Sequence, residues 1–270
     1  MAVIQRAYEM GVADVIAKPF QPNIVRRRVE NVLALYTKKE NLEAIVARQT
    51  ESLRRQSLLL ADAMSSIIEF KNMDSGQHIL RIRILTRYLL HMLKDEGYPL
   101  ELSSDEIQLI SEAAVMHDIG KITIPNEILN KPGRLTKEEF EIVKQHTVEG
   151  CEVAKKLKFV RSSEYMKYCF DICRHHHERF DGNGYPDGLK ENEISIWAQV
   201  VSLADVYDAL TNERVYKKAY THEKALEMIK NGECGVFNPL LLECFLKNAG
   251  NMLEYLEENI KKEEALLYES

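Results

Sequence analysis

The chain has 270 residues, of which 45% are hydrophobic and 29% are charged, and its formal net charge is −6. This length allows one substantial domain and a smaller appendage, and the composition is typical of a globular protein. The acidic balance argues against contact with duplex nucleic acid, which usually requires a basic face. No apolar run approaches the roughly 18 residues that span a bilayer, and residues 1–6 lack the apolar core of a signal peptide. We therefore expect a cytoplasmic protein with no membrane span.

The first segment, residues 1–28, has a pattern of its own. It predicts a short helix that ends at Gly11, a strand over residues 13–17, and then Lys18-Pro19-Phe20 before the next helix. This order resembles the last strand and helix of a response-regulator receiver domain, in which Lys-Pro follows the final strand. The strand that would carry the phosphoacceptor Asp is missing. We therefore expect a small β/α remnant that is no working receiver by itself.

Residues 29–65 are predicted to be a helical linker. From Asn23 to Ser75 the sequence contains no Gly or Pro, which favours one long helix. An apolar seam follows this helix and is interrupted by Gln49 and Gln56; its members are Val32, Leu35, Leu42, Ile45, Leu53 and Leu60. Such a seam is typical of a modest coiled coil and hence of a homodimer, whereas the alternative is a solvated helix that lies on the bundle.

Residues 66–260 are predicted to form an all-α domain, followed by a C-terminal tail over residues 261–270. Helical periodicity beyond Ser75 predicts helices over residues 76–96, 104–119, 136–157, 162–177, 195–212, 222–231 and 238–260. Ser103 or Ser104 and Thr136 are expected N-caps, and Glu139 completes a capping box with Thr136. Neither alternating strand patterns nor internal repeats stand out, so we expect a helix bundle.

Side chains that can bind metal ions occur in clusters along this helical region. They are Asp74 with His78, His117 with Asp118, His146, His175 to His177, and Asp205. About one helix and its connection separate each cluster from the next, so a bundle could aim one cluster inward from each of several helices. Imidazole and carboxylate suit Fe, Mn, Zn or Ni, and a carboxylate can bridge two ions. With the glycine-containing loop at residues 181–186 behind them, the clusters predict a multinuclear metal hydrolase.

The motif His-Asp-x-Gly-Lys at residues 117–121, with Gly-Tyr-Pro at residues 184–186, resembles the HD-GYP subgroup of the HD phosphohydrolase superfamily. Further matching stretches are residues 116–125, 131–133, 146, 176–179, 181–188 and 204–210, and the likeness covers roughly residues 66–250. The resemblance implies an HD-type helix bundle and a bacterial signalling phosphodiesterase that hydrolyses cyclic di-GMP to linear pGpG, to GMP, or to both. It also implies two or three divalent metal ions, often iron, with manganese or zinc as alternatives.

By this resemblance the metal ligands fall on positions where the chain has a His or an Asp. They are His78, His117, Asp118, His146, His176, His177 and Asp205. Asp118 would be the carboxylate that bridges two ions. Asp74 lies one helical turn before His78, at a position where relatives with three ions carry Glu. Because Asp has a shorter reach than Glu, a third metal site at Asp74 stays open.

The resemblance also implies which residues act on the substrate. We hypothesise that a hydroxide bridging two metal ions attacks the phosphodiester, with Asp118 as the shared catalytic ligand. Lys121 could hold a non-bridging phosphate oxygen and stabilise the developing charge. Tyr185 can offer a ring to a base, and Arg214 and Lys217 match positions that contact the dinucleotide in relatives. For the three basic residues, the alternative is a solvated surface charge.

Two other interpretations remain open at this point. One is a different HD-type phosphohydrolase that acts on a nucleotide monophosphate or on a hybrid cyclic dinucleotide. The other is a signalling adaptor that binds cyclic di-GMP or a partner protein without turnover, which the receiver-like segment and the long helix would support. Two neighbours of the cluster are also left open: His175 should face away from His176 and His177, and Glu178 either orients a ligand or is a surface acid.

Overall fold

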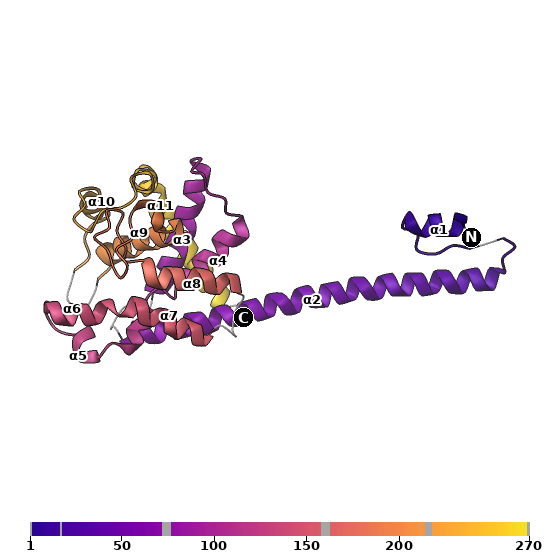
Figure 1. Cartoon of the computed structure of the whole chain (residues 1–270), viewed down its shortest axis with the longest axis horizontal. Coiled ribbons are helices and arrows are strands. Elements are labelled where there is room, and N and C mark those ends of the chain that lie inside the picture. Colours follow the sequence, from indigo (N-terminus) through magenta and orange to yellow (C-terminus); the bar gives the residue numbers. More distant parts are fainter. Residues whose placement is uncertain (1, 17, 72–76, 158–162, 214–217, 269–270) are drawn as a thin grey trace. The chain divides into compact units, whose positions relative to one another are not determined.

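The computed structural model describes residues 2–16, 18–71, 77–157, 163–213 and 218–268 (Figure 1). All the regular secondary structure within these ranges is helical, as the sequence predicted for the main domain. The chain divides into two compact units, Met1–Gln56 and Ser57–Ser270. Each unit is described by itself.

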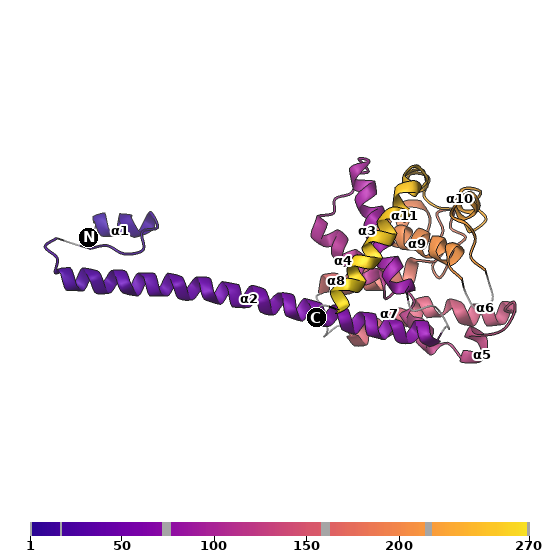
Figure 2. The same ribbon diagram turned by 180° about the vertical axis from the view of Figure 1, so that it is seen from behind.

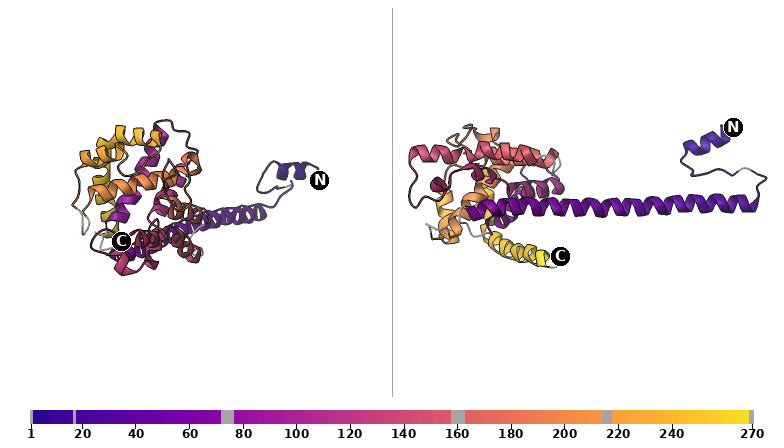
Figure 3. Two further views of the ribbon diagram at one scale, coloured as in Figure 1. Left: turned by 60° about the vertical axis from the view of Figure 1, so that its left-hand side comes forward. Right: turned by 90° about the horizontal axis from the view of Figure 1, so that it is seen from below.

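The first unit contains α1 (Ala2–Glu9) and the first part of α2 (Pro22–Lys71), joined by an irregular segment (Figure 3). The carboxylate of Asp14 holds this unit together, because it accepts hydrogen bonds from Tyr8 in α1 and from Arg28 in α2. The predicted β/α remnant is wrong, since residues 12–16 form no strand. A strand requires a neighbour that pairs with its N–H and C=O groups. No other described residue is in a strand that could act as that neighbour.

The single long helix predicted from Asn23 onward is confirmed, because α2 has 50 residues and ends at Lys71. Leu35, Leu42 and Leu53 of the apolar seam are exposed on the chain by itself, at 67%, 58% and 64%. The last turns of α2 differ, because Ala61, Ser65, Ile68 and Glu69 are buried. None of the described helices is both long enough and apolar enough to cross a membrane.

The second unit is a helix bundle around one apolar core (Figure 2). Its long helices are α3 (His78–Asp95), α4 (Ser104–Ala114), α7 (His146–Leu157), α8 (Ser163–His175), α9 (Ile196–Thr211) and α11 (Pro239–Tyr268). Helix α3 packs against α4, α9 and α11, while α8 packs against α4, α7 and α9. Fully buried side chains at these contacts include Ile82, Ile107, Ile172 and Phe245. Each stabilises the fold by about 1.5–3 kcal/mol through loss of contact with water.

Shorter elements complete the second unit. They are η1 (Ile119–Thr123), α5 (Asn126–Leu129), α6 (Lys137–Lys144), η2 (Glu191–Glu193) and α10 (His222–Lys230). Both predicted capping residues are confirmed, because Ser103 forms a capping box with Glu106 and Thr136 forms one with Glu139. Such boxes satisfy backbone N–H groups that a helix leaves unpaired at its start.

Two predicted helices are each divided in the structure. The helix expected over residues 104–119 ends at Ala114, because the next amides bond three residues back and tighten the chain into η1. The helix expected over residues 136–157 is interrupted at Gln145, where α6 ends and His146 begins α7. Neither break has a Gly or Pro to signal it.

Segment η1 packs against α7 more closely than a side chain would permit. A Cβ atom on Gly120 would lie 1.9 Å from the carbonyl oxygen of His146 and 2.5 Å from the amide nitrogen of Gly150. Only Gly allows two backbones to approach in this way. The contact brings the residues around Asp118 beside the start of α7, where His146 lies.

Candidate metal centre

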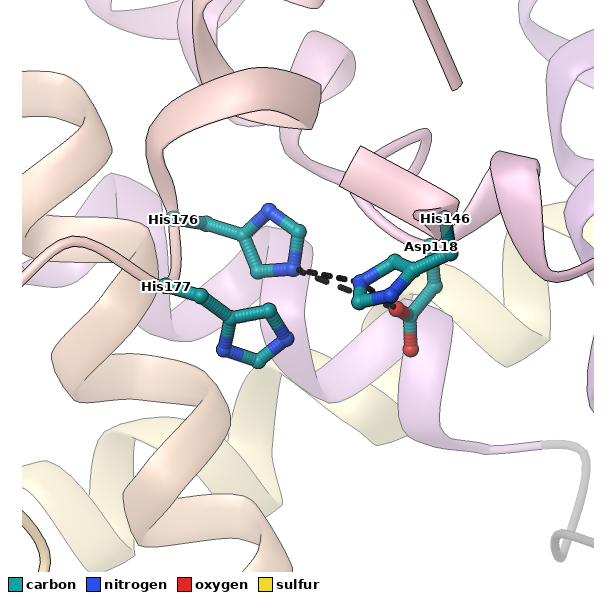
Figure 4. Close-up of side chains that lie close together, drawn as sticks. All are labelled: Asp118, His146, His176 and His177. Carbon is teal, nitrogen blue, oxygen red and sulfur yellow. Dashed lines mark hydrogen bonds and ion pairs between the residues drawn. The ribbon is translucent and has the colours of Figure 1, made fainter. Parts of the chain in front are cut away.

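One group of potential metal ligands joins Asp118 to three histidines (Figure 4). Asp118 immediately precedes η1, His146 begins α7, and His176 and His177 follow the end of α8. The Asp118 Oδ1 atom lies 3.3 Å from His146 Nε2 and 3.9 Å from His176 Nε2. The four residues can offer ligand atoms that all lie within 4.8 Å of one another. This spacing suits a metal ion bound among them.

A second group shares the same aspartate. It consists of His78 at the start of α3, His117, and Asp118, again with ligand atoms within 4.8 Å of one another. The Oδ1 atom of Asp205, on α9, lies 3.9 Å from His78 Nε2 and 4.0 Å from His117 Nε2. Asp118 therefore belongs to both groups, with its Oδ1 atom toward His146 and its Oδ2 atom 3.4 Å from His117 Nε2.

The ring nitrogens show that these sites suit cations. In His117, His146 and His176 the Nδ1 atom lies 2.6–2.9 Å from a backbone carbonyl oxygen of the same turn. A carbonyl oxygen only accepts, so Nδ1 carries the proton in a neutral ring and Nε2 presents a lone pair. The Nε2 atoms of His146 and His176 are 3.5 Å apart. Two lone pairs at this distance repel unless a cation lies between them, so this donor set fits a metal ion.

His78 is oriented by a side chain instead. Its Nδ1 atom lies 2.7 Å from Oδ2 of Asp208, and its Nε2 atom lies 3.4 Å from Nε2 of His117. Asp208 is itself buried and accepts further hydrogen bonds from Arg81 and Asn212. A carboxylate behind a ligating histidine fixes the ring and makes its other nitrogen a stronger ligand. Asp208 was not among the residues predicted for the site, although it lies three residues after Asp205 on the same helix.

The surroundings favour the metal-binding protonation states of Asp118, His146, His176 and His177, whereas at His117 they favour the protonated ring. Burial lowers the pKa of His176 to about 3 and that of His177 well below its usual value. Burial also lowers the pKa of His146, against the effect of Asp118, whereas at His117 the effect of Asp118 outweighs burial and the pKa is raised. Burial would raise the pKa of Asp118, but Lys121 and His117 outweigh it and hold that pKa well below its usual range. Neutral imidazoles and an ionised carboxylate are the ligand forms.

Lys121 and Tyr185 lie beside this centre. The Lys121 ammonium donates to Oδ2 of Asp118. The ring of Tyr185 lies against that of His177, with centroids 4.8 Å apart and an angle of 31° between the planes. Both residues therefore border the two groups of potential ligands. Asp74, Arg214 and Lys217 lie outside the described residues.

Glu178 is a buried anchor for the Gly-Tyr-Pro loop rather than a surface acid. Its carboxylate accepts hydrogen bonds from the amides of Asp187, Gly188 and Leu189, at 2.7–3.1 Å. The loop returns so closely that a Cβ atom on Gly184 would lie 2.3 Å from Glu178 Cα. Glu178 therefore holds the loop beside the histidines. His175 faces elsewhere, as expected, because its Nδ1 atom lies 2.6 Å from Asp171.

The end of α2 contacts both sides of the centre. The Lys71 ammonium donates to three backbone carbonyls, those of Lys121, Ile122 and Ile124, at 2.7–3.1 Å. Glu69 accepts from the amide of Ile79, beside His78, at 2.9 Å. The sequence pattern indicated neither contact, because Lys71 meets residues 50–53 positions away and Glu69 meets a residue ten positions away in the next helix.

Comparisons with known proteins agree with this geometry. The family model described as "HD domain" matches residues 62–234. The chain is 33% identical over 274 residues to a probable cyclic di-GMP phosphodiesterase of Vibrio cholerae, covering 97% of this chain and 62% of that protein. It is 31% identical over 256 residues to the cyclic di-GMP phosphodiesterase response regulator RpfG of Xanthomonas campestris, covering 92% of this chain and 65% of that protein.

A third relative carries a different substrate in its name. The chain is 31% identical over 209 residues to 3'3'-cGAMP-specific phosphodiesterase 2 of Vibrio cholerae, covering 77% of this chain and 37% of that protein. The chain thus spans less than two thirds of the length of each of these three relatives. Two groups of potential ligands share Asp118, and the family model matches residues 62–234. The chain therefore belongs to the HD domain family, whose phosphohydrolase members bind divalent metal ions.

Proposed function

We propose that the chain is a metal-dependent phosphodiesterase of the HD-GYP subgroup that hydrolyses cyclic di-GMP to linear pGpG, to GMP, or to both. The observation that carries this proposal is the position of Asp118, which belongs to two histidine groups at once. Two relatives of the chain are named as cyclic di-GMP phosphodiesterases, which favours this substrate.

The proposed metal ligands divide at Asp118. His146, His176 and His177 would hold one ion with Asp118, while His78, His117 and Asp205 would hold the other with it. When bound, divalent ions activate a water and neutralise charge on the phosphodiester. We propose iron, which the sequence resemblance favours, although histidine and carboxylate donors also suit manganese and zinc. Asp74 is proposed as a ligand of a third ion.

The remaining roles belong to polar and aromatic side chains around these ligands. Lys121 would turn from Asp118 to a non-bridging phosphate oxygen and oppose the charge that develops there. Tyr185 would stack a base beside His177. Arg214 and Lys217 are proposed as contacts to the dinucleotide from their place in the sequence motif. These residues orient the substrate so that the scissile phosphate faces the ligand groups.

A hybrid cyclic dinucleotide is the second candidate substrate. The relative named as a 3'3'-cGAMP-specific phosphodiesterase is 31% identical to the chain, close to the identity of the other two relatives. Overall similarity therefore does not separate the two substrates. The difference must come from contacts to the bases, because the sugars and phosphates are common to both.

We also propose that α2 forms a parallel coiled coil with a second copy of the chain. Leu35, Leu42 and Leu53 are exposed on this helix and recur at intervals of seven or eleven residues. Such spacing places apolar side chains on one stripe, which a second identical helix can cover. A long helix of this kind could also bind signalling partner proteins.

The test is anaerobic reconstitution with Fe(II), Mn(II) or Zn(II), followed by incubation with cyclic di-GMP or 3'3'-cGAMP and chromatography of the nucleotides. We expect metal-dependent formation of linear dinucleotide or GMP from cyclic di-GMP. Asp118→Ala should abolish turnover, whereas Asp105→Ala, at an exposed position on α4, should not. Unchanged nucleotide with all three metals would contradict the proposal. If cyclic di-GMP bound without turnover, the chain would be an adaptor.

A further inference from the structure

Tyr185 contacts a second aromatic side chain besides the ring of His177. Phe140, on α6, packs against Tyr185 with ring centroids 6.1 Å apart and planes at 83°. The ammonium of Lys144, one turn later on the same helix, lies 5.0 Å from the Phe140 centroid and 5.5 Å from the Tyr185 centroid. We call these three residues the Phe140 corner. Two nearly perpendicular rings form its walls, and a cation lies over both.

The Phe140 corner is tied to the metal centre through two connections. Tyr185 stacks on His177, which is one of the potential ligands. Phe140 contacts Tyr185, so Tyr185 connects Phe140 to this ligand. Lys144 is the last residue of α6, and His146 begins α7 two residues later. The ring of His146 is in turn fixed by the carbonyl of Val143. Helix α6 therefore carries Phe140 and also supplies the Val143 carbonyl that fixes the ring of His146.

The exposure of Phe140 is the feature that packing leaves unexplained. Its side chain is 43% exposed, although it lies beside a half-buried tyrosine and could be covered by a ligand. Lys144 keeps 26% of its side chain exposed and pairs with Glu141 at 2.6 Å, which is itself 65% exposed. A pair this accessible to water is weak, so the ammonium can exchange it for another acceptor.

From this geometry we infer that the Phe140 corner is a subsite for a guanine base of the substrate, with Phe140 and Lys144 as substrate-binding residues. The inference rests on the proposed function and names how the base would be selected. A planar base stacks on the exposed ring of Phe140. The Lys144 ammonium then faces the base edge, where guanine offers two acceptors, O6 and N7.

The same contact discriminates against adenine. Adenine keeps the N7 acceptor but replaces O6 with an amino group, which is a donor. An ammonium has only donors, so adenine would set two donors against each other. The four-carbon stem of Lys144 lets the ammonium follow the base edge as it enters. Stacking on Phe140, by contrast, is equally available to both bases, so the two residues should have separable effects.

The test is steady-state hydrolysis of cyclic di-GMP by the metal-loaded full chain, with cyclic di-AMP as a competitive inhibitor. Lys144→Gln should raise the KM for cyclic di-GMP roughly tenfold and leave the inhibition constant of cyclic di-AMP unchanged or lower, because an amide can pair with the adenine edge. Phe140→Ala should raise both constants by a similar factor, about tenfold. Lys137→Gln, at an exposed position on the same helix, is the matched control and should change neither.

The outcomes separate this inference from the proposed function. If the wild-type chain fails to hydrolyse cyclic di-GMP with any metal, the proposed function fails. If it hydrolyses cyclic di-GMP but Lys144→Gln behaves as Lys137→Gln does, the guanine subsite is wrong. An equal rise of both constants in Lys144→Gln would also overturn the assignment to guanine. Thermal melting and metal content of each variant, expected to match wild type, exclude a folding defect.

Discussion

The two groups of potential metal ligands orient their histidines in different ways. In the group formed by His146, His176 and His177 with Asp118, the first two rings are fixed by backbone carbonyls of their own turns. In the other group, His117 is fixed in the same way, but His78 is fixed by the carboxylate of Asp208, 130 residues away in sequence. One group thus depends on local helix geometry and the other on a long-range side-chain contact.

The two groups should therefore differ in their sensitivity to substitution of neighbouring residues. A backbone carbonyl is present whatever the side chain, so the orientation of His146 and His176 survives most changes nearby. The orientation of His78 depends on Asp208, whose carboxylate accepts hydrogen bonds from Arg81 and Asn212. We therefore expect side-chain changes away from the ligands to affect the His78 group first.

Removal of metal should have the largest effect, because it acts on both groups. Chelation by EDTA is expected to lower the melting temperature by about 10 °C, since the free energy of metal binding stabilises the folded state. The measurement is thermal denaturation followed by circular dichroism, with and without restored Mn(II). A melting temperature that chelator leaves unchanged would show that the buried imidazole pairs need no cation.

Asp208→Asn should weaken only one half of the centre. The amide keeps one acceptor for His78 but removes the negative charge that strengthens its other nitrogen as a ligand. We expect the affinity for one metal ion to fall about 10–100-fold while the other is retained. Calorimetric titration with Mn(II) measures this, with Asp105→Asn, at an exposed position on α4, as the matched control. Equal weakening of both ions would remove the distinction between the two groups.

The Gly-Tyr-Pro loop, like His78, is held by a side chain, which is that of Glu178. Glu178→Ala leaves three backbone amides without their acceptor and should lower the free energy of unfolding by about 2 kcal/mol. Glu178→Gln keeps one oxygen, which in the wild type serves the amides of Asp187 and Gly188, so its effect should be smaller. Urea denaturation measures both. An equal effect of the two substitutions would show that the hydrogen bonds from Asp187 and Gly188 do not hold the loop.

Lys71→Met should have the smallest effect of the four. The change removes a donor to three carbonyls around η1 but keeps a similar apolar stem, so we expect a loss of about 1 kcal/mol in the free energy of unfolding. Lys71→Arg, which retains a cation, should recover part of it. The same urea denaturation applies. Full stability in Lys71→Met would mean that water replaces the ammonium.

Local signals in the sequence predicted much of this fold. Thr136 with Glu139, and Ser103, gave the starts of two helices because capping depends on neighbouring residues only. The breaks at Ala114 and Gln145 were missed, because each arises from tertiary packing rather than from Gly or Pro. The strand expected over residues 13–17 failed for a related reason, since a strand needs a partner that the described residues do not offer.

The sequence predicted which His and Asp side chains come together, but it did not predict most of the residues that orient them. His and Asp are distinctive along a sequence, and the motif spacing indicated which of them meet. Asp208 and Lys71 were missed because Asp and Lys are common on helix surfaces, and only the fold shows that these two face His78 and η1. Glu178 was left undecided, since burial separates an anchor from a surface acid.

The most direct test of the central claim is the number of metal ions that each chain binds. Because Asp118 belongs to both groups of potential ligands, we expect wild-type protein reconstituted anaerobically with Fe(II) to contain at least two ions per chain by mass spectrometry of the metal. Asp118→Ala should lose affinity for both ions together. A single ion in wild type, or a variant that keeps its full metal content, would contradict the account.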